Sequence, residues 1–562
     1  MTIQQKFKLW CQNVSQEHLP QLLEIQGDDN KLNQAFLGDL KFGTAGMRSV
    51  MGMGTSGLNV YTIAKATKGV AQFLKQTLNK QIKVAISYDN RRHGKLFAER
   101  CALVFCGELI QCFLFEEPTA TPLLAFATRQ LGCDLGVMIT ASHNSAEYNG
   151  FKIFDSFGTQ FVETDEIARL IGLVDVFDIF LPNLDELKSN RMLQYVDDTV
   201  VDMFIKNLDT LVDHSEDCSL SNLDVVYTPL NGTGGSLMPQ LIEKYNAKLF
   251  VVPEQSFCDG DFVTCPHPNP EHASTFKLAL EYAQQLRSDI VIATDPDADR
   301  VGAMVLHEGD YRHLSGNEVG ILLTQFLLSQ NATSLSPIVN PLIVRTVVST
   351  PLVDRIASYY GAKVKTTLTG FKYIGTHIKY LQDANATDNF LIGFEESMGY
   401  LVGTHIGDKD SFVATVLLLQ VAALAKRNGK TIVDRLKQIY EQFGCFCNET
   451  VSVKFDGVEG ASFIDKFMAD LRCKLPTQFG RFKVMEVQDF FSHSDPLMRA
   501  NLLLFKLECD ATILIRPSGT EPLLKVYLMV LLSDSADATM MQELKLSVNQ
   551  LVNDVKFAGF AT

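Results

Sequence analysis

Three aspartates alternate with other residues in the segment DPDADR, which begins at Asp295 and follows the apolar run DIVIAT. In an extended or tightly turning segment, alternate residues face one side. The carboxylates of Asp295, Asp297 and Asp299 would therefore crowd together and raise one another's pKa. A bound divalent cation relieves that repulsion, and hard oxygen ligands favour Mg²⁺. A solvated acidic turn is the alternative interpretation. The spacing does not fit an EF-hand, because the required Gly and the distant Glu are missing.

A serine and a histidine follow a second apolar run, LGVMI, in the segment TASHNSAEYNGFK (140–152). A serine hydroxyl needs activation before it can attack a substrate. Neither a Ser-His-Asp order nor a G-x-S-x-G elbow is readable, and in an extended segment the side chain of His143 would point away from that of Ser142. A serine that carries a phosphoryl group beside the cation of the three aspartates fits better, because a metal ion and cationic side chains stabilise the transferring charge. An ordinary polar turn at a strand end is the alternative.

The segment RPSGTEP (516–522) follows the strand-like run ATILI. Arg516 could offer a phosphate a planar, charge-assisted fork. Hydroxyls and backbone N–H groups for phosphate oxygens would come from the small residues that follow: Ser518, Gly519 and Thr520. A plain turn between two strands explains the same residues without a ligand.

The segment GFEESMGY (393–400) places Glu395 and Ser397 on a glycine-flanked loop after the run NFLI. Carboxylates beside a hydroxyl suit hydrogen bonding to sugar hydroxyls. The alternative is a helix start with acidic residues near its N-terminus. A further glycine-bearing loop, FGTAGMR (42–48), ends in Arg48.

The elements that must position these loops follow one pattern: a short β-rich run, a polar or glycine-rich loop, and a helix-like segment. The pattern begins at KVAISYDNRR (83–92), and helical segments such as GNEVGILLTQFLLSQ (316–330) lie between the strands. This alternation predicts α/β layers with mostly parallel or mixed sheets. Ligands bind such sheets at the carboxyl ends of their strands, where the polar loops of this series, from residues 83–92 to 389–400, are expected to lie.

The C-terminal part of the chain differs, because several strand-like runs follow one another closely before a helix-like tail that starts near Ala536. This pattern predicts a smaller α+β domain with an antiparallel sheet. We expect four domains, three similar α/β domains and this α+β domain. Their predicted bounds, in order, are 1–205 with the serine, 206–318 with the aspartates, 319–445 with the sugar loop and 446–562 with the phosphate loop.

Composition narrows the class of protein. A net charge of -15 argues against non-specific binding to nucleic acid or to anionic membranes, although local Arg and Lys can still bind an anionic substrate. The apolar run VATVLLLQVAALA (413–425) is too short to span a bilayer and predicts a buried helix. The N-terminal segment lacks the apolar core of a signal peptide. Twelve scattered cysteines, with a single C-x-C at Cys445 and Cys447, favour a reducing compartment, and we expect a cytoplasmic protein.

Four of these motifs occur together and in order: TASHNSAEYNGFK, DPDADR, GFEESMGY and RPSGTEP. The set resembles the α-D-phosphohexomutase superfamily, and the resemblance covers nearly the whole chain. Three further segments are similar to the long phosphoglucomutase branch, which also holds phosphopentomutases and bisphosphate synthases: FGTAGMR, TGFKYIG and GTHIGDKD.

The resemblance implies four domains around a central cleft, with a phosphoserine at Ser142 that holds Mg²⁺ together with Asp295, Asp297 and Asp299. It places these residues near the transferred phosphoryl group: Arg48, His143, Arg300 and Lys152, the last as a proton-transfer partner. It places these residues at the substrate and its hydroxyls: Thr369, Gly370, Lys372, Glu395 and Ser397. It assigns the phosphate that does not react to Arg516, Ser518, Gly519 and Thr520.

The implied activity is the interconversion of glucose 1-phosphate and glucose 6-phosphate, with glucose 1,6-bisphosphate as intermediate and primer. The expected partner is a small sugar phosphate, with neither nucleic acid nor membrane, and the expected state is a monomer or small homo-oligomer. Mannose or pentose phosphates and bisphosphate synthesis remain open. So do an aspartyl-phosphate phosphatase with Asp295 as nucleophile and a sugar-phosphate-binding regulatory protein without turnover. Ser145 and Ala146 stand where relatives often carry prolines, which predicts a more mobile loop. Met398 stands where an aromatic residue is frequent, which leaves the sugar preference open.

Overall fold

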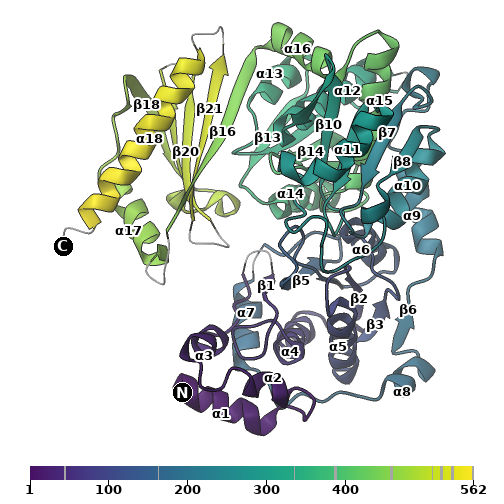
Figure 1. Ribbon diagram of the computed structural model, residues 1–562, viewed down its shortest axis with the longest axis vertical. Coiled ribbons are helices and arrows are strands. Elements are labelled where there is room, and N and C mark those ends of the chain that lie inside the picture. The colour runs from purple at the N-terminus through teal and green to yellow at the C-terminus, as the bar shows by residue number, and fades with distance from the viewer. Residues whose placement is uncertain are drawn as a thin grey trace. The chain divides into compact units, whose positions relative to one another are not determined.

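A computed structural model describes the chain except for residues 44–45, 163, 335, 385–388, 456–459, 509, 519–522, 533–536 and 560–562. The chain forms two compact units. The first consists of Met1–Ser315, Ile374–Asp388 and Ser397–Thr431, and the second of Gly316–Tyr373, Asn389–Glu396 and Ile432–Thr562. Figure 1 labels many of the elements of both.

The first unit begins with three helices that pack around the buried Trp10 and Phe36. They are α1 (Ile3–Asn13), α2 (Leu19–Leu23) and α3 (Asp29–Phe36). A six-stranded mixed sheet follows, in the order β1 (Met47–Val50), β5 (Tyr148–Asp155), β4 (Leu135–Ile139), β2 (Lys83–Tyr88), β3 (Gln111–Leu114) and β6 (Leu193–Tyr195). Strands β4, β2, β3 and β6 are parallel, and β5 is antiparallel to both β4 and β1.

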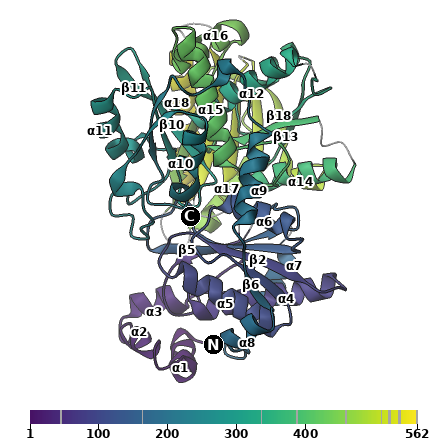
Figure 2. The ribbon, with the colours of Figure 1, turned by 90° about the vertical axis from the view of Figure 1, so that its right-hand side faces the viewer.

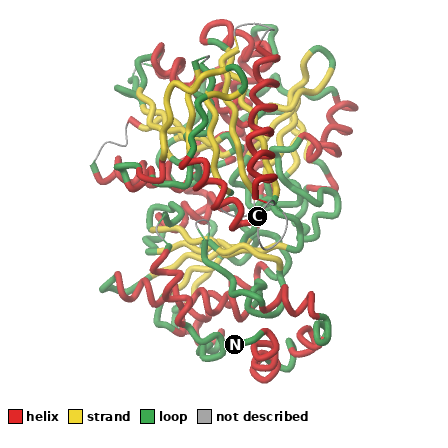
Figure 3. The backbone as a smooth tube through the Cα atoms, turned by 90° about the vertical axis from the view of Figure 1, so that its left-hand side faces the viewer, coloured by secondary structure: helices red, strands yellow, loops and turns green. Residues whose placement is uncertain are grey.

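Helices cover both faces of this sheet, which explains why β4 is buried along its whole length. Figure 2 shows α4 (Val60–Thr77) and α5 (Gly94–Gly107) on one side and α6 (Thr121–Gln130) on the other. The remaining helices of this segment are α7 (Asp165–Leu173), α8 (Leu184–Ser189) and α9 (Thr199–Asp209). The backbone tube in Figure 3 shows the same layering of helices and strands.

A second sheet of the first unit has five strands, in the order β11 (Asp310–Leu314), β10 (Val301–His307), β9 (Ile290–Thr294), β7 (Asp224–Thr228) and β8 (Lys248–Val251). Strands β8, β7 and β9 are parallel, and β10 and β11 are added antiparallel. The helices beside it are α10 (Gly234–Lys244), α11 (Lys277–Leu286) and α15 (Ser411–Arg427), and a further strand of this unit is β15 (Gly399–Val402). Helix α15 contains the apolar run 413–425 and is buried on nearly all sides, as predicted.

The second unit contains a parallel arrangement in which β12 (Leu342–Thr346) lies between β13 (Lys363–Thr367) and β14 (Phe390–Glu395). Its helices are α12 (Gly316–Thr333), α13 (Leu352–Tyr359) and α16 (Ile432–Phe443). At α14 (Phe371–Asp383) the chain passes from the second unit into the first.

The C-terminal sheet of the second unit is antiparallel, as predicted, in the order β16 (Cys445–Lys454), β21 (Leu523–Leu532), β20 (Thr512–Pro517), β19 (Leu503–Leu507), β18 (Phe482–Asp489) and β17 (Gln478–Phe479). Alternation along the strands separates two apolar faces. Helices α17 (Gly460–Cys473) and α18 (Asp537–Gly559) pack on one face, beside residues such as Phe505 and Val526. Leu504, Leu514 and Tyr527 on the other face pack against Val347 and Leu368.

The α/β class with a C-terminal α+β part is therefore confirmed. The predicted bounds at residues 205, 318 and 445 stay a prediction. Eleven of the twelve cysteines lie in the described residues and are free thiols. Among the described helices, none combines the length and the hydropathy that a bilayer crossing would need.

Candidate active site

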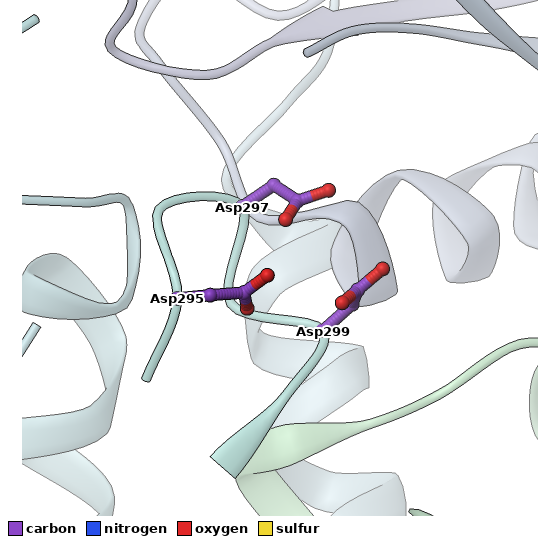
Figure 4. A group of neighbouring side chains, drawn as sticks. All are labelled: Asp295, Asp297 and Asp299. Carbon is purple, nitrogen blue, oxygen red and sulfur yellow. The ribbon is translucent and has the colours of Figure 1, made fainter. Parts of the chain in front are cut away.

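The three aspartates lie in the turn between β9 and β10. Each is at most 1% exposed. One carboxylate oxygen of each lies within 4.8 Å of one oxygen of the other two. Figure 4 shows Asp295, Asp297 and Asp299 on one turn with their carboxyl groups on the same side. The predicted crowding of three carboxylates is present.

Two backbone contacts fix this turn, and one of them needs the space that a glycine leaves. The N–H of Thr233 donates to the carbonyl of Pro296 at 2.8 Å. A Cβ on Gly232 would lie 2.5 Å from Cα of Pro296, so only glycine allows this approach. On the other side, the N–H of Thr121 at the start of α6 donates to the carbonyl of Asp297 at 2.9 Å.

Burial and the neighbouring charges shift the pKa values of Asp295 and Asp297 in opposite directions. Burial, together with the carboxylates of Asp297 and Asp299, raises the pKa of Asp295 well above its ordinary value. Burial would also raise the pKa of Asp297, but the charge and hydrogen bond of Lys152 and the hydroxyl of Thr121 hold that pKa below the ordinary range. Lys152 Nζ lies 2.7 Å from Asp297 Oδ2, and Thr121 Oγ1 lies 2.9 Å from the same oxygen.

Two oxygens of this cluster are buried without a hydrogen-bond partner among the described residues: Asp297 Oδ1 and Asp299 Oδ1. A buried, unpartnered carboxylate oxygen is costly unless it is paired or coordinates a metal. The donor set contains only oxygens, which suits a hard divalent cation. The residues present therefore fit a metal ion, and the cluster could bind one.

Ser142 lies beside this cluster. Its hydroxyl donates to Asp295 Oδ2 at 2.8 Å, and the residue is 2% exposed. Its backbone φ is 52°, which is left-handed rather than extended. The expectation that His143 points away from Ser142 assumed an extended segment and is wrong here, because Nδ1 of the ring lies 3.3 Å from Ser142 Oγ. Burial and the charges of Arg300 and Arg48 lower the pKa of His143 well below its usual value.

Three predicted cationic residues also lie in this unit. Lys152 is on β5, 4% exposed, and contacts Asp297 and Asp299. Arg300 follows the aspartates; its N–H donates to Asp295 Oδ1 at 3.0 Å and its guanidinium to Glu271 at 2.6 Å. Arg48 is on β1, and its guanidinium donates to the side chain of Asn144 at 2.7 Å, two residues beyond Ser142.

The predicted sugar-binding residues divide between the units. In the second unit, Glu395 at the end of β14 accepts a hydrogen bond from the N–H of Gly370 at 2.7 Å. Burial lowers the pKa of Lys372 to about 8. Thr369 precedes Gly370, and Ser397 belongs to the first unit. Met398 is 1% exposed, and its sulfur accepts a hydrogen bond from the hydroxyl of Tyr400 at 3.7 Å. Its side chain therefore packs in the interior.

The predicted phosphate loop follows β20 of the second unit. Arg516 Nη2 donates to the hydroxyl of Tyr527 at 3.0 Å. The N–H of Ser518 donates to the carbonyl of Leu523 at 2.7 Å, which links the residue after β20 to the first residue of β21. Gly519 and Thr520 lie outside the described residues.

Four family models match the chain in order, and all describe one family. They are phosphoglucomutase/phosphomannomutase alpha/beta/alpha domains I, II and III, over residues 39–172, 202–309 and 315–443, and the C-terminal domain, over residues 472–545. The chain belongs to the phosphoglucomutase/phosphomannomutase family. It is therefore a phosphohexomutase, an enzyme of the isomerase class, as the ordered motifs predicted.

Curated relatives of this phosphohexomutase carry the name phosphoglucomutase. That of Staphylococcus epidermidis (strain ATCC 12228 / FDA PCI 1200) is 33% identical over 505 residues, 87% of this chain and 90% of the relative. That of Staphylococcus aureus (strain N315) is 32% identical over 546 residues, 94% of this chain and 96% of the relative.

Solved structures share the fold of this mutase. A putative phosphomannomutase from Thermus thermophilus has a TM-score of 0.69 at 21% identity and covers 92% of this chain and 99% of its own. The open form of the Paramecium phosphoprotein pp63/parafusin, a phosphoglucomutase, has a TM-score of 0.69 at 18% identity. The match covers 93% of this chain and 96% of the Paramecium chain.

Sequence reasoning missed several polar residues that contact the aspartate cluster. Lys409 Nζ lies 3.2 Å from Asp299 Oδ2 and 3.0 Å from Asp408 Oδ1. Both lie in the segment GTHIGDKD, where the alternation of acid and base was visible but its distance from the aspartates was not. Thr121 stands in an apolar helix start, a context that gives no signal of contact with Asp297.

A divalent cation bound by these three carboxylates would have a direct thermodynamic consequence. Adding Mg²⁺ at about one hundred times its Kd should stabilise the native state by about 2.7 kcal/mol, because only the folded chain assembles the three carboxylates. Thermal unfolding with Mg²⁺, and with Mg²⁺ plus excess chelator, measures this. Asp299→Asn should reduce the shift. An equal shift in that variant would show that the ion binds elsewhere.

Proposed function

We propose that this phosphohexomutase interconverts glucose 1-phosphate and glucose 6-phosphate through a phosphoserine at Ser142 and a glucose 1,6-bisphosphate intermediate. The observation that carries the proposal is the 2.8 Å contact between Ser142 Oγ and Asp295 within a buried carboxylate cluster. Relatives more than 30% identical over most of the chain are named phosphoglucomutases, which supports glucose phosphate as the substrate.

In the proposed mechanism, the phosphoserine gives its phosphoryl group to the free hydroxyl of the sugar monophosphate, which loses its proton. The P–O bond to Ser142 Oγ breaks, and a bisphosphate forms. After the sugar reorients, Ser142 Oγ attacks the other phosphate, which restores the phosphoserine and releases the isomeric monophosphate. We assign proton transfer to Lys152: its ammonium gives a proton to Ser142 Oγ as the P–O bond breaks, and the amine so formed accepts the proton of the sugar hydroxyl. In the second transfer, Lys152 protonates the sugar oxygen that leaves and accepts the proton of the Ser142 hydroxyl. We assign charge stabilisation at the transferring group to Arg48, His143 and Arg300.

Asp295, Asp297 and Asp299, with the phosphoserine, would hold Mg²⁺, which supplies charge neutralisation at the phosphoryl group when bound. The short contact with Asp297 orients the ammonium of Lys152 before substrate binds. We further assign sugar binding to Thr369, Gly370, Lys372, Glu395 and Ser397. Their N–H, hydroxyl, ammonium and carboxylate groups match sugar hydroxyls and phosphate oxygens.

A mutase needs a second anion site, because each intermediate carries one phosphate that is not reacting. We assign it to Arg516, Ser518, Gly519 and Thr520. The enzyme is proposed to act as a monomer or small homo-oligomer in the cytoplasm, with glucose 1,6-bisphosphate as primer.

Arg516→Ala tests the anion site. Charge-assisted hydrogen bonds to phosphate contribute about 1.5–3 kcal/mol, so the variant should raise KM about 10–100-fold while kcat changes little. Steady-state kinetics measure both constants. Arg481→Ala is the control, because Arg481 is 68% exposed, forms an ion pair with Glu543 and lies over the ring of Phe482, away from the residues assigned to the anion site. An unaltered KM in Arg516→Ala would contradict the assignment.

A coupled assay across glucose, mannose, ribose and glucosamine phosphates tests the substrate. We expect the highest kcat/KM with glucose 1-phosphate and a requirement for the bisphosphate primer. A higher value with mannose or pentose phosphates, or net accumulation of bisphosphate, would replace the proposed reaction by one of its family alternatives.

A further inference from the structure

The backbone of Ser142 is held in an unfavourable conformation. Its φ of 52° is left-handed, which costs an L-residue with a side chain about 1–2 kcal/mol. Such a conformation persists only where surrounding contacts impose it. The N–H of Ser142 donates to Thr140 Oγ1 at 2.7 Å, and its carbonyl accepts from Arg91 Nη2 at 2.6 Å. Both sides of the residue are therefore fixed.

Arg91 binds more of this segment than one carbonyl. We call residues 140–148 the serine loop. The two terminal nitrogens of the guanidinium donate to four of its carbonyls, those of Ser142, Asn144, Ser145 and Tyr148. A guanidinium is planar and rigid, so these four carbonyls must converge on one plane at fixed spacings.

Other contacts fix Arg91 in turn. Its side chain and that of Asp89 are fully buried, and Arg91 Nε lies 3.2 Å from Asp89 Oδ2. The guanidinium lies over the ring of Phe262 at 5.0 Å from the ring centroid. Asp89 Oδ2 also accepts the hydroxyl of Thr140 at 2.5 Å. One carboxylate therefore orients both groups that hold the backbone of Ser142.

We propose that Arg91 is a positioning residue for phosphoryl transfer: it holds the serine loop so that Ser142 Oγ stays beside Asp295. Within the serine loop, the contacts described for Arg91 are all with backbone carbonyls, so Arg91 acts through the position of Ser142. The inference rests on the mutase reaction proposed above. A lysine cannot replace the fork, because its ammonium is a point charge and cannot hold four carbonyls in a plane.

The test compares Arg91→Lys with Arg92→Lys, since the neighbouring Arg92 is 61% exposed and pairs with Asp261. A displacement of about 1 Å in a reacting group can cost about 100-fold in rate. We expect Arg91→Lys to lower kcat about 30–100-fold while KM for glucose 1-phosphate stays within about threefold. Arg92→Lys should change neither. A kcat near the wild-type value in folded Arg91→Lys, or an effect confined to KM, would overturn the proposal.

If Arg91→Lys does not fold, a second pair of variants tests whether these contacts position Ser142. Thr140→Val removes the hydroxyl between Asp89 and Ser142, while Thr140→Ser keeps it. We expect the first to lower kcat about tenfold and the second to recover most of it. A kcat in Thr140→Val equal to that of Thr140→Ser would contradict the inference.

Amide hydrogen exchange tests the role of Arg91 independently of the proposed reaction. If the wild-type chain does not turn over glucose 1-phosphate, the reaction fails, but exchange still tests the loop. Amides of the serine loop should exchange at least about tenfold faster in Arg91→Lys or Thr140→Val than in the wild type and Arg92→Lys. Unchanged exchange would show that these residues do not hold the loop.

Discussion

Ser142→Ala should lower kcat by at least about 10⁴-fold, because the variant has no oxygen on which the phosphoryl group can rest between the two transfers. The loss should appear in kcat rather than in KM, since the alanine removes no group assigned to sugar binding. Steady-state kinetics with primer present measure this. The methyl side chain leaves the backbone contacts of Arg91 and Thr140 available, and the fold is expected to persist.

The matched control is Ser156→Ala, an exposed serine in the turn after β5. It should turn over at the wild-type rate. Circular dichroism and the melting temperature establish that Ser142→Ala is folded. If folded Ser142→Ala retains near-normal turnover, the phosphoserine mechanism is wrong.

Asp297→Asn should lower kcat about 100–1,000-fold and weaken the response to Mg²⁺ together. The amide removes one negative charge from the proposed metal site. It also replaces the carboxylate that pairs with Lys152 at 2.7 Å. Because the ammonium of Lys152 would then be buried with one fewer partner, a lower melting temperature should accompany the kinetic loss. Activity titrated with Mg²⁺ gives the metal dependence and the rate in one experiment.

Asp310→Asn is the control for charge alone, because Asp310 is exposed on β11. Its Mg²⁺ titration should match that of the wild type. An unchanged Mg²⁺ response in Asp297→Asn would remove Asp297 from the metal site.

Strand ends, the aspartate cluster and a buried helix could be predicted from the sequence, because each depends on a local pattern of residues. Apolar runs end at the polar loops of β4, β9 and β14, and the alternation of Asp295, Asp297 and Asp299 does place three carboxylates together. The buried helix α15 was also predicted from its composition. These features depend on residues close in sequence.

Contacts between distant segments were not predictable from local pattern. Arg91 looks like a polar residue after a strand, yet it binds the loop that carries Ser142. Lys409 reaches Asp299 from another part of the chain. The orientation of His143 was predicted incorrectly, because the left-handed backbone of Ser142 is imposed by tertiary contacts and leaves no mark in the residue types around it.

Locating the transferred phosphoryl group on the chain tests the central claim most directly. The enzyme is incubated with Mg²⁺ and glucose 1,6-bisphosphate labelled in its phosphates, and the labelled peptide is identified by mass spectrometry. We predict an acid-stable label on Ser142 that moves to glucose 1-phosphate when this sugar is added. A hydroxylamine-sensitive label on Asp295 with release of inorganic phosphate, or an unlabelled Ser142 during turnover, would contradict the account.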